Sequence, residues 1–293
     1  MAYGASVSPG PQLFNESISS YLPQYHSLKD NTKCILQRLL SPNFVEKCKN
    51  NDKEKYEKIQ LLLERKEAHC SAETFTACHL LLNHEIKVGV SYPFEHALSS
   101  EQFDDYFFGY DTFILRSVEE NQQNLNFEDI PVELPDKTLI AVFYIKPNWP
   151  GRSNHICNGG FLSSYYYRKK GGGLLCGEFF KHLAKKLNYR ASIFNLVFVD
   201  NPQSMRLWEY LKFEKIAVVK EAGRHPILNH NENDNNIHEH YVDAVMWRCD
   251  LTQELESIPM PWENGKIENK NENENNKDPG SPLFGIGSVA PCP

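Results

Sequence analysis

The sequence predicts a mixed α/β fold, in which a twisted sheet carries helices on both faces. An apolar segment, GFLSSYYY (160–167), leads through the turn Arg168-Lys-Lys-Gly-Gly-Gly173 into LLCGEFFKHLAKKL (174–187), whose apolar spacing indicates a helix. The run SIFNLVFVDN (192–201) is almost entirely β-branched, aromatic or aliphatic, which indicates a fully buried strand. Helix and strand patterns then continue to alternate up to residue 250, as a mixed sheet with helices on both faces requires.

The first third of the chain is expected to be mainly helical. Residues 1–30 are predicted to be a flexible N-terminus, because the chain up to about Leu22 is rich in Pro, Gly and Ser. A short strand (34–40) and charged amphipathic helices, including 55–66, are expected to form an N-terminal helical extension. Two further helices are predicted at 75–85 and 99–108, the second because it begins with serine and carries acids early.

Strands dominate the middle and the end of the folded region. The expected strands are 110–118, 139–147, the residues around 158–162, 192–201, 214–219 and 241–250. A helix over 201–213 is favoured by the proline just inside its start. One domain is therefore expected over 31–252, with its core at about 110–252. Residues 253–293 include the polar tract GKIENKNENENNKDPGSP and are predicted to be a disordered tail.

Composition excludes several classes of function. The 293-residue chain has a net charge of −7, which disfavours general binding to nucleic acid because phosphate contacts need clustered Lys and Arg. No apolar run approaches the ~20 residues of a membrane helix, and no targeting segment stands out. The eight cysteines show no C-x-x-C spacing and indicate reduced thiols. A cytoplasmic protein is expected, with a mitochondrial pool left open.

Metal binding is not expected. The histidines near the segment NHNENDNNIHEH (229–240) are interpreted as part of a polar hairpin insertion.

The turn from Arg168 to Gly173 is predicted to bind an anion. A strand, a glycine turn and a helix in this order direct unpaired backbone N–H groups and the positive end of the helix dipole at one point. Gly171 and Gly173 would let the backbone approach phosphates, and the local cluster Arg168, Lys169 and Lys170 suggests one phosphorylated ligand. The alternative is a solvated basic turn that caps a helix.

These segments carry a resemblance to a known family. Arg-x-x-Gly-x-Gly resembles the pyrophosphate loop of the GNAT superfamily of acetyl-CoA-dependent N-acetyltransferases, and NPQSMRLWEYLKF (201–213) resembles the segment that follows the fifth strand there. FYIKPN, SNHICNGGFL, SIFNLVFVDN and VDAVMWRCDLT look like the yeast and fungal N-acetyltransferases that detoxify azetidine-2-carboxylate, a proline analogue. The similarity covers roughly 78–252. It implies a GNAT-like fold, acetyl-CoA as co-substrate, a small amine or imino acid as acceptor, and a homodimer, for which the apolar strand around 242–247 is a candidate sheet-edge contact.

The resemblance also implies a set of site residues. Asn158 and Asn195 are expected to be catalytic and, with Phe161 and Trp208, to bind the substrate. The expected contacts with acetyl-CoA are Phe161, Leu162, Ser163, Arg168, Lys169, Lys170, Gly171, Gly172, Gly173 and Asn201. Asn195 interrupts an apolar strand, where a buried amide needs all its hydrogen bonds; a purely structural bridge between strands is the alternative. Phe161 and Trp208 could equally be core aromatics.

Trp208 departs from the superfamily pattern. It stands where many GNAT enzymes carry the tyrosine that protonates the departing thiolate. Three functions follow from these features: a small-molecule N-acetyltransferase, a protein or polyamine N-acetyltransferase, and a non-catalytic acyl-CoA binding module.

Overall fold

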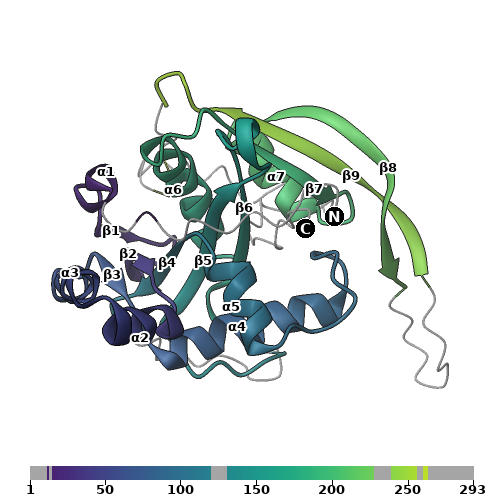
Figure 1. The fold of residues 1–293 in the computed structure, drawn as a ribbon. Coiled ribbons are helices and arrows are strands. Elements are labelled where there is room, and N and C mark those ends of the chain that lie inside the picture. The colour runs from purple at the N-terminus through teal and green to yellow at the C-terminus, as the bar shows by residue number, and fades with distance from the viewer. Residues whose placement is uncertain (1–11, 13–14, 120–130, 228–238, 256–259, 263–293) are drawn as a thin grey trace, which may run out of the picture.

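The computed structural model describes residues 12, 15–119, 131–227, 239–255 and 260–262. Within them one mixed sheet runs in the order β1-β2-β4-β5-β6-β7-β9-β8, with β3 beside β2 (Figure 1). The strands are β1 Gln24–Ser27, β2 Lys33–Leu39, β3 Ala68–His69, β4 Asp111–Ser117, β5 Leu139–Pro147, β6 Ile156–Ser163, β7 Ala191–Phe198, β8 Glu214–Pro226 and β9 Glu239–Asp250. The helices are α1 Glu16–Ser19, α2 Pro42–Asn51, α3 Lys53–Glu64, α4 Ala72–Val88, α5 Ser100–Phe108, α6 Gly172–Lys186 and α7 Pro202–Tyr210, with 3-10 turns at Gly151–Ser153 and Tyr165–Tyr167. The mixed α/β class predicted from the sequence is confirmed.

The N-terminal region joins the same sheet: the short strand predicted at 34–40 is β2, and the charged helix predicted at 55–66 lies largely in α3. Strand β2 pairs antiparallel with β4, and β1 pairs with β2. Arg38 of β2 forms a buried ion pair with Asp111 of β4. The described part of residues 1–30 is also packed, because Ile18 and Leu28 are buried in the main core. Burial of these apolar side chains holds the segment on the domain, so the folded part begins before residue 31.

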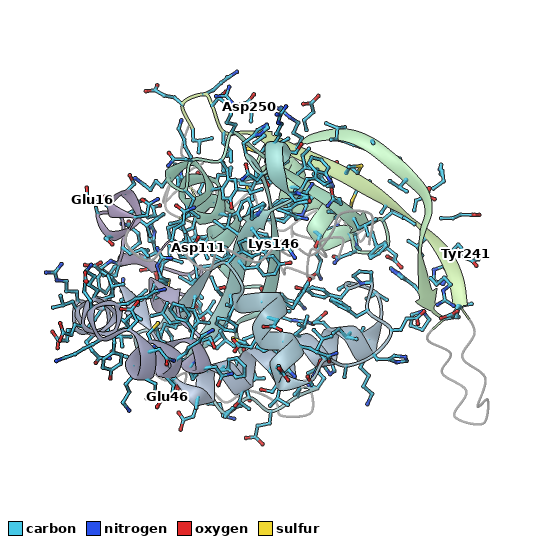
Figure 2. All side chains as sticks on the ribbon, in the orientation of Figure 1. Glu16, Glu46, Asp111, Lys146, Tyr241 and Asp250 are labelled. Atoms are coloured by element: carbon cyan, nitrogen blue, oxygen red, sulfur yellow. The ribbon has the colours of Figure 1, made fainter. Side chains whose placement is uncertain are left out.

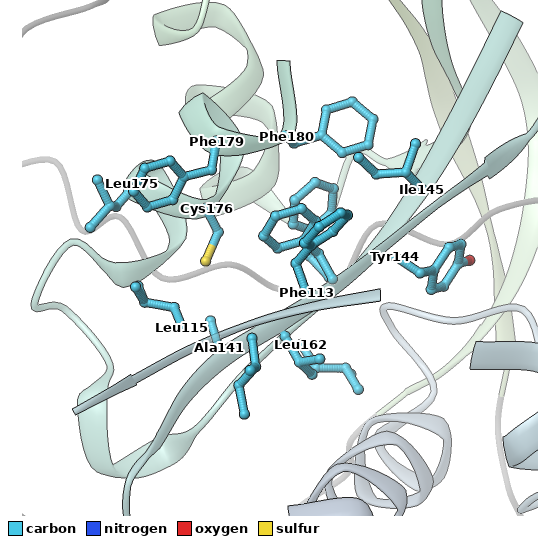
Figure 3. Packing of buried hydrophobic residues seen from close by; sticks show 14 of the residues in the cluster. Phe113, Leu115, Ala141, Tyr144, Ile145, Leu162, Leu175, Cys176, Phe179 and Phe180 are labelled. Carbon is cyan, nitrogen blue, oxygen red and sulfur yellow. The ribbon is translucent and has the colours of Figure 1, made fainter. Parts of the chain in front are cut away.

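Helices cover both faces of the central strands. Neighbouring residues of a strand point to opposite faces, and Phe143 of β5 packs on Phe180 of α6, whereas Tyr144 packs on Phe107 of α5. Figure 3 shows Phe179 and Phe180 on the α6 side of the strands, with Leu162 on the other side. Helices α4 and α5 therefore cover one face and α6 the other (Figure 1).

The two predicted helices before the central strands begin and end as their sequences indicate. The Ser71 side chain accepts hydrogen bonds from the first amides of α4, and Gly89, with φ of 77°, ends that helix. Ser99 forms a capping box with Gln102 at the start of α5.

At the other end of the sheet, β9 lies between β7 and β8. The apolar strand around 242–247 is therefore interior to the sheet, and the expectation of an edge contact there is wrong. β8 is the edge strand instead, and its side chains are mostly exposed.

Some expectations fall outside the described residues, namely most of the predicted tail and residues 229–238 of the Asn-rich segment predicted at 229–240. Across the described helices, none combines the length and the apolar character needed to cross a membrane.

Candidate active site

The central parallel strands, β6 and β7, separate soon after they begin. They are paired at only two positions, Ile156 with Ala191 and Cys157 with Ser192, although both continue for several more residues. On their outer sides β6 pairs with β5, and β7 pairs with β9. The facing edges of β6 and β7 beyond these positions therefore carry backbone groups that do not pair with each other, and an extended, amide-containing ligand could pair with them.

Three asparagine side chains meet where β6 and β7 separate. Asn148 Nδ2 donates to Asn195 Oδ1 at 3.0 Å, and Asn195 Nδ2 donates back to Asn148 Oδ1 at 2.6 Å. Asn158 Nδ2 donates to the same Asn148 oxygen at 3.0 Å, and Asn158 Oδ1 accepts the Gly159 amide at 2.7 Å. We call Asn148, Asn158 and Asn195 the carboxamide cluster. The two predicted asparagines are thus brought together through a third, which the sequence did not indicate.

Local backbone features position the cluster. Asn148 follows the end of β5, and its N–H donates to the Ile156 carbonyl at 2.8 Å, so it continues the pairing of β5 with β6. Asn195 lies at an irregularity in the β7–β9 register between Phe194 and Val197. An extra residue in a strand bends it locally and redirects a side chain, which accounts for a polar residue leaving the apolar strand here. The signal that could have revealed Asn148 was the register of the β5–β6 hairpin.

The glycine corner, residues Gly171–Gly173, lies at the start of α6 as predicted. Gly171 is the N-cap with φ of 88°, a conformation that favours glycine, and no side chain caps the helix. The first amides of α6 therefore lack acceptors within the helix, as at an anion site. Two of the three predicted basic residues already have acidic partners: Arg168 pairs with Glu85 at 2.9 Å and Lys170 with Asp30 at 3.0 Å.

The glycine corner is covered in this structure. All three glycines are buried, and a Cβ built on Gly171 would lie 2.3 Å from the ring of Trp262. Trp262 Nε1 donates to the Ser27 carbonyl at 3.0 Å, which holds the ring in place. Of the predicted basic residues, Lys169 is exposed, without an ion pair in the described part of the chain.

The comparison with curated proteins decides the family. N-acetyltransferase aca1 of Schizosaccharomyces pombe is 36% identical to this chain over 178 residues, which are 60% of this chain and 79% of that protein. The chain belongs to this family of N-acetyltransferases. Protein SPT10 of Saccharomyces cerevisiae is 28% identical over 173 residues, covering 48% of this chain and 27% of that protein. No protein-family model matches this N-acetyltransferase.

Two solved structures are similar to the N-acetyltransferase. A GCN5-related N-acetyltransferase from Kribbella flavida has 21% identity and a TM-score of 0.48, with 62% of this chain and 94% of that chain covered. A GNAT-superfamily phosphinothricin acetyltransferase from Sinorhizobium meliloti, solved in complex with AcCoA, has 15% identity and a TM-score of 0.45, with 62% and 85% covered.

In the present protein, the strand edge predicted to hold the co-substrate lies on the side of β6 that faces β7, beyond the two positions where these strands pair. The Phe161 carbonyl accepts a hydrogen bond at 3.2 Å from the hydroxyl of Tyr92, which lies in the connection between α4 and α5. Ser163 Oγ is buried and has no hydrogen-bond partner among the described residues, whereas Leu162 lies in the core. Asn201 caps α7, since its side chain accepts the Ser204 amide at 3.1 Å.

Phe161 and Trp208 of the N-acetyltransferase lie inside the aromatic core. Both side chains have 0% exposure, and their ring centroids are 5.2 Å apart. Phe161 packs on Phe180 of α6, on the side of β6 opposite to the side chain of Asn158. This arrangement corresponds to the core-aromatic alternative, and a contact with substrate stays a prediction.

Proposed function

We propose that this protein transfers the acetyl group of acetyl-CoA directly to the amine of a small amino acid, most readily a proline analogue such as azetidine-2-carboxylate. The observation that carries the proposal is the carboxamide cluster at the point where β6 and β7 separate. Membership of an N-acetyltransferase family supports the reaction type. The sequence resemblance to the azetidine-2-carboxylate family supports the acceptor.

Several residues suit the co-substrate. The unpaired edge of β6 would accept the amides of a pantetheine arm, and Ser163 Oγ is a buried group in need of a partner. The uncapped start of α6 would hold the diphosphate through its backbone amides. Trp262 lies against Gly171 in this structure, so we expect the ring to shift when a nucleotide binds. Acetyl-CoA itself supplies the activated acetyl thioester.

The carboxamide cluster can orient an amine without acting as a base. Each carboxamide offers both donors and an acceptor. The acceptor oxygens would hold the N–H groups of the neutral amine, and the amide N–H groups would stabilise the oxyanion that develops on the thioester carbonyl. The amine nitrogen forms the new C–N bond, and the C–S bond breaks with its electron pair remaining on sulfur, so that coenzyme A departs as the thiolate. The proton lost by nitrogen passes to water or to the substrate carboxylate. Asn148, which bonds to both predicted asparagines, would position them.

The homodimer implied by the resemblance is also a proposal. The edge strand β8 exposes the apolar side chains of Ile216, Val218 and Val219, which are 40%, 43% and 38% exposed. Exposed apolar residues along an unpaired strand edge favour pairing with another chain. A second copy joined at β8 is therefore the form of dimer that we expect.

The transfer reaction is tested by measuring thiol release from acetyl-CoA with azetidine-2-carboxylate, a basic peptide and spermidine in parallel. We expect turnover with the amino acid. Asn158→Ala should lower kcat/KM by roughly 100-fold, the usual effect of removing one oxyanion donor. Asn43→Ala, which removes an exposed asparagine bonded to Asp104, is the matched control. An Asn158→Ala protein with full kcat/KM would exclude the proposed role, and turnover of the peptide or spermidine alone would replace the proposed acceptor.

A further inference from the structure

Lys146 of β5 lies beside the carboxamide cluster. In the antiparallel register Lys146 is directly opposite Asn158 of β6. Opposite residues of two paired strands point to the same face, with Cβ atoms about 4.5–5.5 Å apart. Tyr144 lies two residues before Lys146 on β5, and Asn148 lies two residues after it, where the pairing with β6 continues beyond the end of β5. Lys146, Asn158 and Tyr144 therefore share the face that α5 covers.

Two aromatic rings lie beside the ammonium group of Lys146. Its Nζ lies 4.9 Å from the centroid of the Tyr106 ring and 5.3 Å from that of Tyr144. Phe94 packs edge-on against Tyr106, with centroids 5.0 Å apart, and extends this apolar wall. Figure 2 places Lys146 near the centre of the molecule, close to α5. Burial lowers the pKa of Lys146 to about 8, still above neutral pH, so the ammonium form prevails there.

Lys146 is half-buried and, unlike the buried cations Arg38 and Lys181, has no acidic partner among the described residues. Lys181, at 4% exposure, pairs with Glu178 at 2.6 Å, and the buried Arg38 pairs with Asp111. A partly desolvated charge without a counter-ion carries a free-energy cost, and the two ring faces offset only part of that cost. A ligand with a negative charge would supply the missing partner.

We propose that Lys146 binds the carboxylate of the acceptor amino acid while the carboxamide cluster holds its amine. The proposal rests on the proposed acetyl transfer and adds the group that selects the acceptor. In an α-amino acid the carboxylate and the nitrogen are attached to the same carbon, which matches adjacent anchoring positions on one face of two strands. Tyr106 and Tyr144 would contact the small apolar ring. A polyamine is disfavoured, because its cationic groups would meet the half-buried ammonium group of Lys146.

The test compares azetidine-2-carboxylate with its neutral carboxamide in the wild type and in Lys146→Met. Taking the ratio of the two kcat/KM values within each protein, and then comparing the ratios, cancels the different reactivity of the two amines. A hydrogen bond to a charged group predicts that Lys146→Met reduces the preference for the carboxylate roughly 10- to 100-fold. The KM for acetyl-CoA should not change. Lys146→Arg should retain part of the preference, and Lys53→Met, which replaces an exposed lysine on α3, should behave as wild type.

Binding is measured separately by calorimetry with free coenzyme A in place of acetyl-CoA, so that no reaction occurs. Lys146-dependent binding of the carboxylate without turnover of any amine would support the anchor and refute the transfer function. Turnover of azetidine-2-carboxylate with an unchanged preference in Lys146→Met would refute the anchor and leave the transfer function standing. Equal losses of kcat/KM for the carboxylate and the carboxamide would also refute the anchor, because they would indicate that Lys146 has a structural role. The wild-type protein alone tests the idea if the variant misfolds: equal binding of the acid and the amide overturns it.

Discussion

Replacing Asn148 with alanine should both destabilise the protein and impair transfer. Asn148 is the centre of the carboxamide cluster, since its oxygen accepts from Asn158 and Asn195 and its nitrogen donates to Asn195. Alanine removes all three hydrogen bonds at once. It leaves the Asn158 nitrogen, in a side chain that is 1% exposed, without a partner.

The size of the effect follows from burial. An orphaned, fully buried amide donor costs about 1–3 kcal/mol. Asn195 is half-buried, so water recovers part of its hydrogen bonding, and its two lost bonds together cost about 1 kcal/mol. The sum is about 2–4 kcal/mol of unfolding free energy, which corresponds to roughly 4–16 °C in Tm for a domain of this size.

Thermal unfolding followed by circular dichroism measures this loss, and the thiol-release assay measures the accompanying fall in kcat/KM. Asn43→Ala makes the same chemical change at an exposed site and should lie within about 0.5 kcal/mol of wild type. If Asn148→Ala melted as Asn43→Ala does, the carboxamide cluster would contribute nothing to the fold. If it also kept wild-type kcat/KM, the idea that Asn148 positions Asn158 and Asn195 would be refuted.

Three further predictions concern packing and pH. Gly159→Ala would place a Cβ 2.5 Å from the Phe180 ring, so overpacking should cost about 1–3 kcal/mol and lower Tm in a melt; an unchanged Tm would mean that Phe180 yields freely. Burial, and then the charge of Arg116, lower the pKa of His69 from 6.5 to about 4. The unfolding free energy that depends on neutral His69 is fully present above pH 6.5 and should be lost as pH falls through about 4. Urea midpoints of the wild type should therefore decline across this pH window, and those of His69→Gln should decline less. Burial also lowers the pKa of Lys146 from 10.5 to about 8, so the folded chain loses this proton before the unfolded chain does. Unfolding free energy should therefore rise with pH across that interval, and a rise of equal size in Lys146→Met would contradict this assignment.

The local patterns of the sequence were sufficient to locate most helices and strands. The strand predicted at 139–147 coincides with β5, and the helices predicted at 75–85 and 99–108 lie within or next to α4 and α5. Periodicity and capping act between residues close in the chain, so they can be read without knowledge of the fold. The family resemblance likewise predicts Asn158 and Asn195 as site residues, and their catalytic role stays a prediction.

Contacts between segments that are distant in the chain could not be predicted from local sequence patterns. Local patterns predicted the strand at 34–40 and the helix at 55–66, but not the pairing of β2 with β1 and β4, because strand pairing depends on which partner the fold presents. The interior position of β9 likewise depends on its pairing with β7 on one side and with β8 on the other, which local patterns do not specify.

The sequence by itself determined the α/β class, the order of the central elements and the family to which the chain belongs. Tertiary structure alone decided that Asn148 joins Asn158 and Asn195, that Lys146 faces two tyrosine rings without an acidic partner among the described residues, and that Trp262 covers Gly171. The physical reason is that hydrogen bonding and burial are properties of neighbours in space. Strand register and helix packing select those neighbours from residues that lie far apart in the chain.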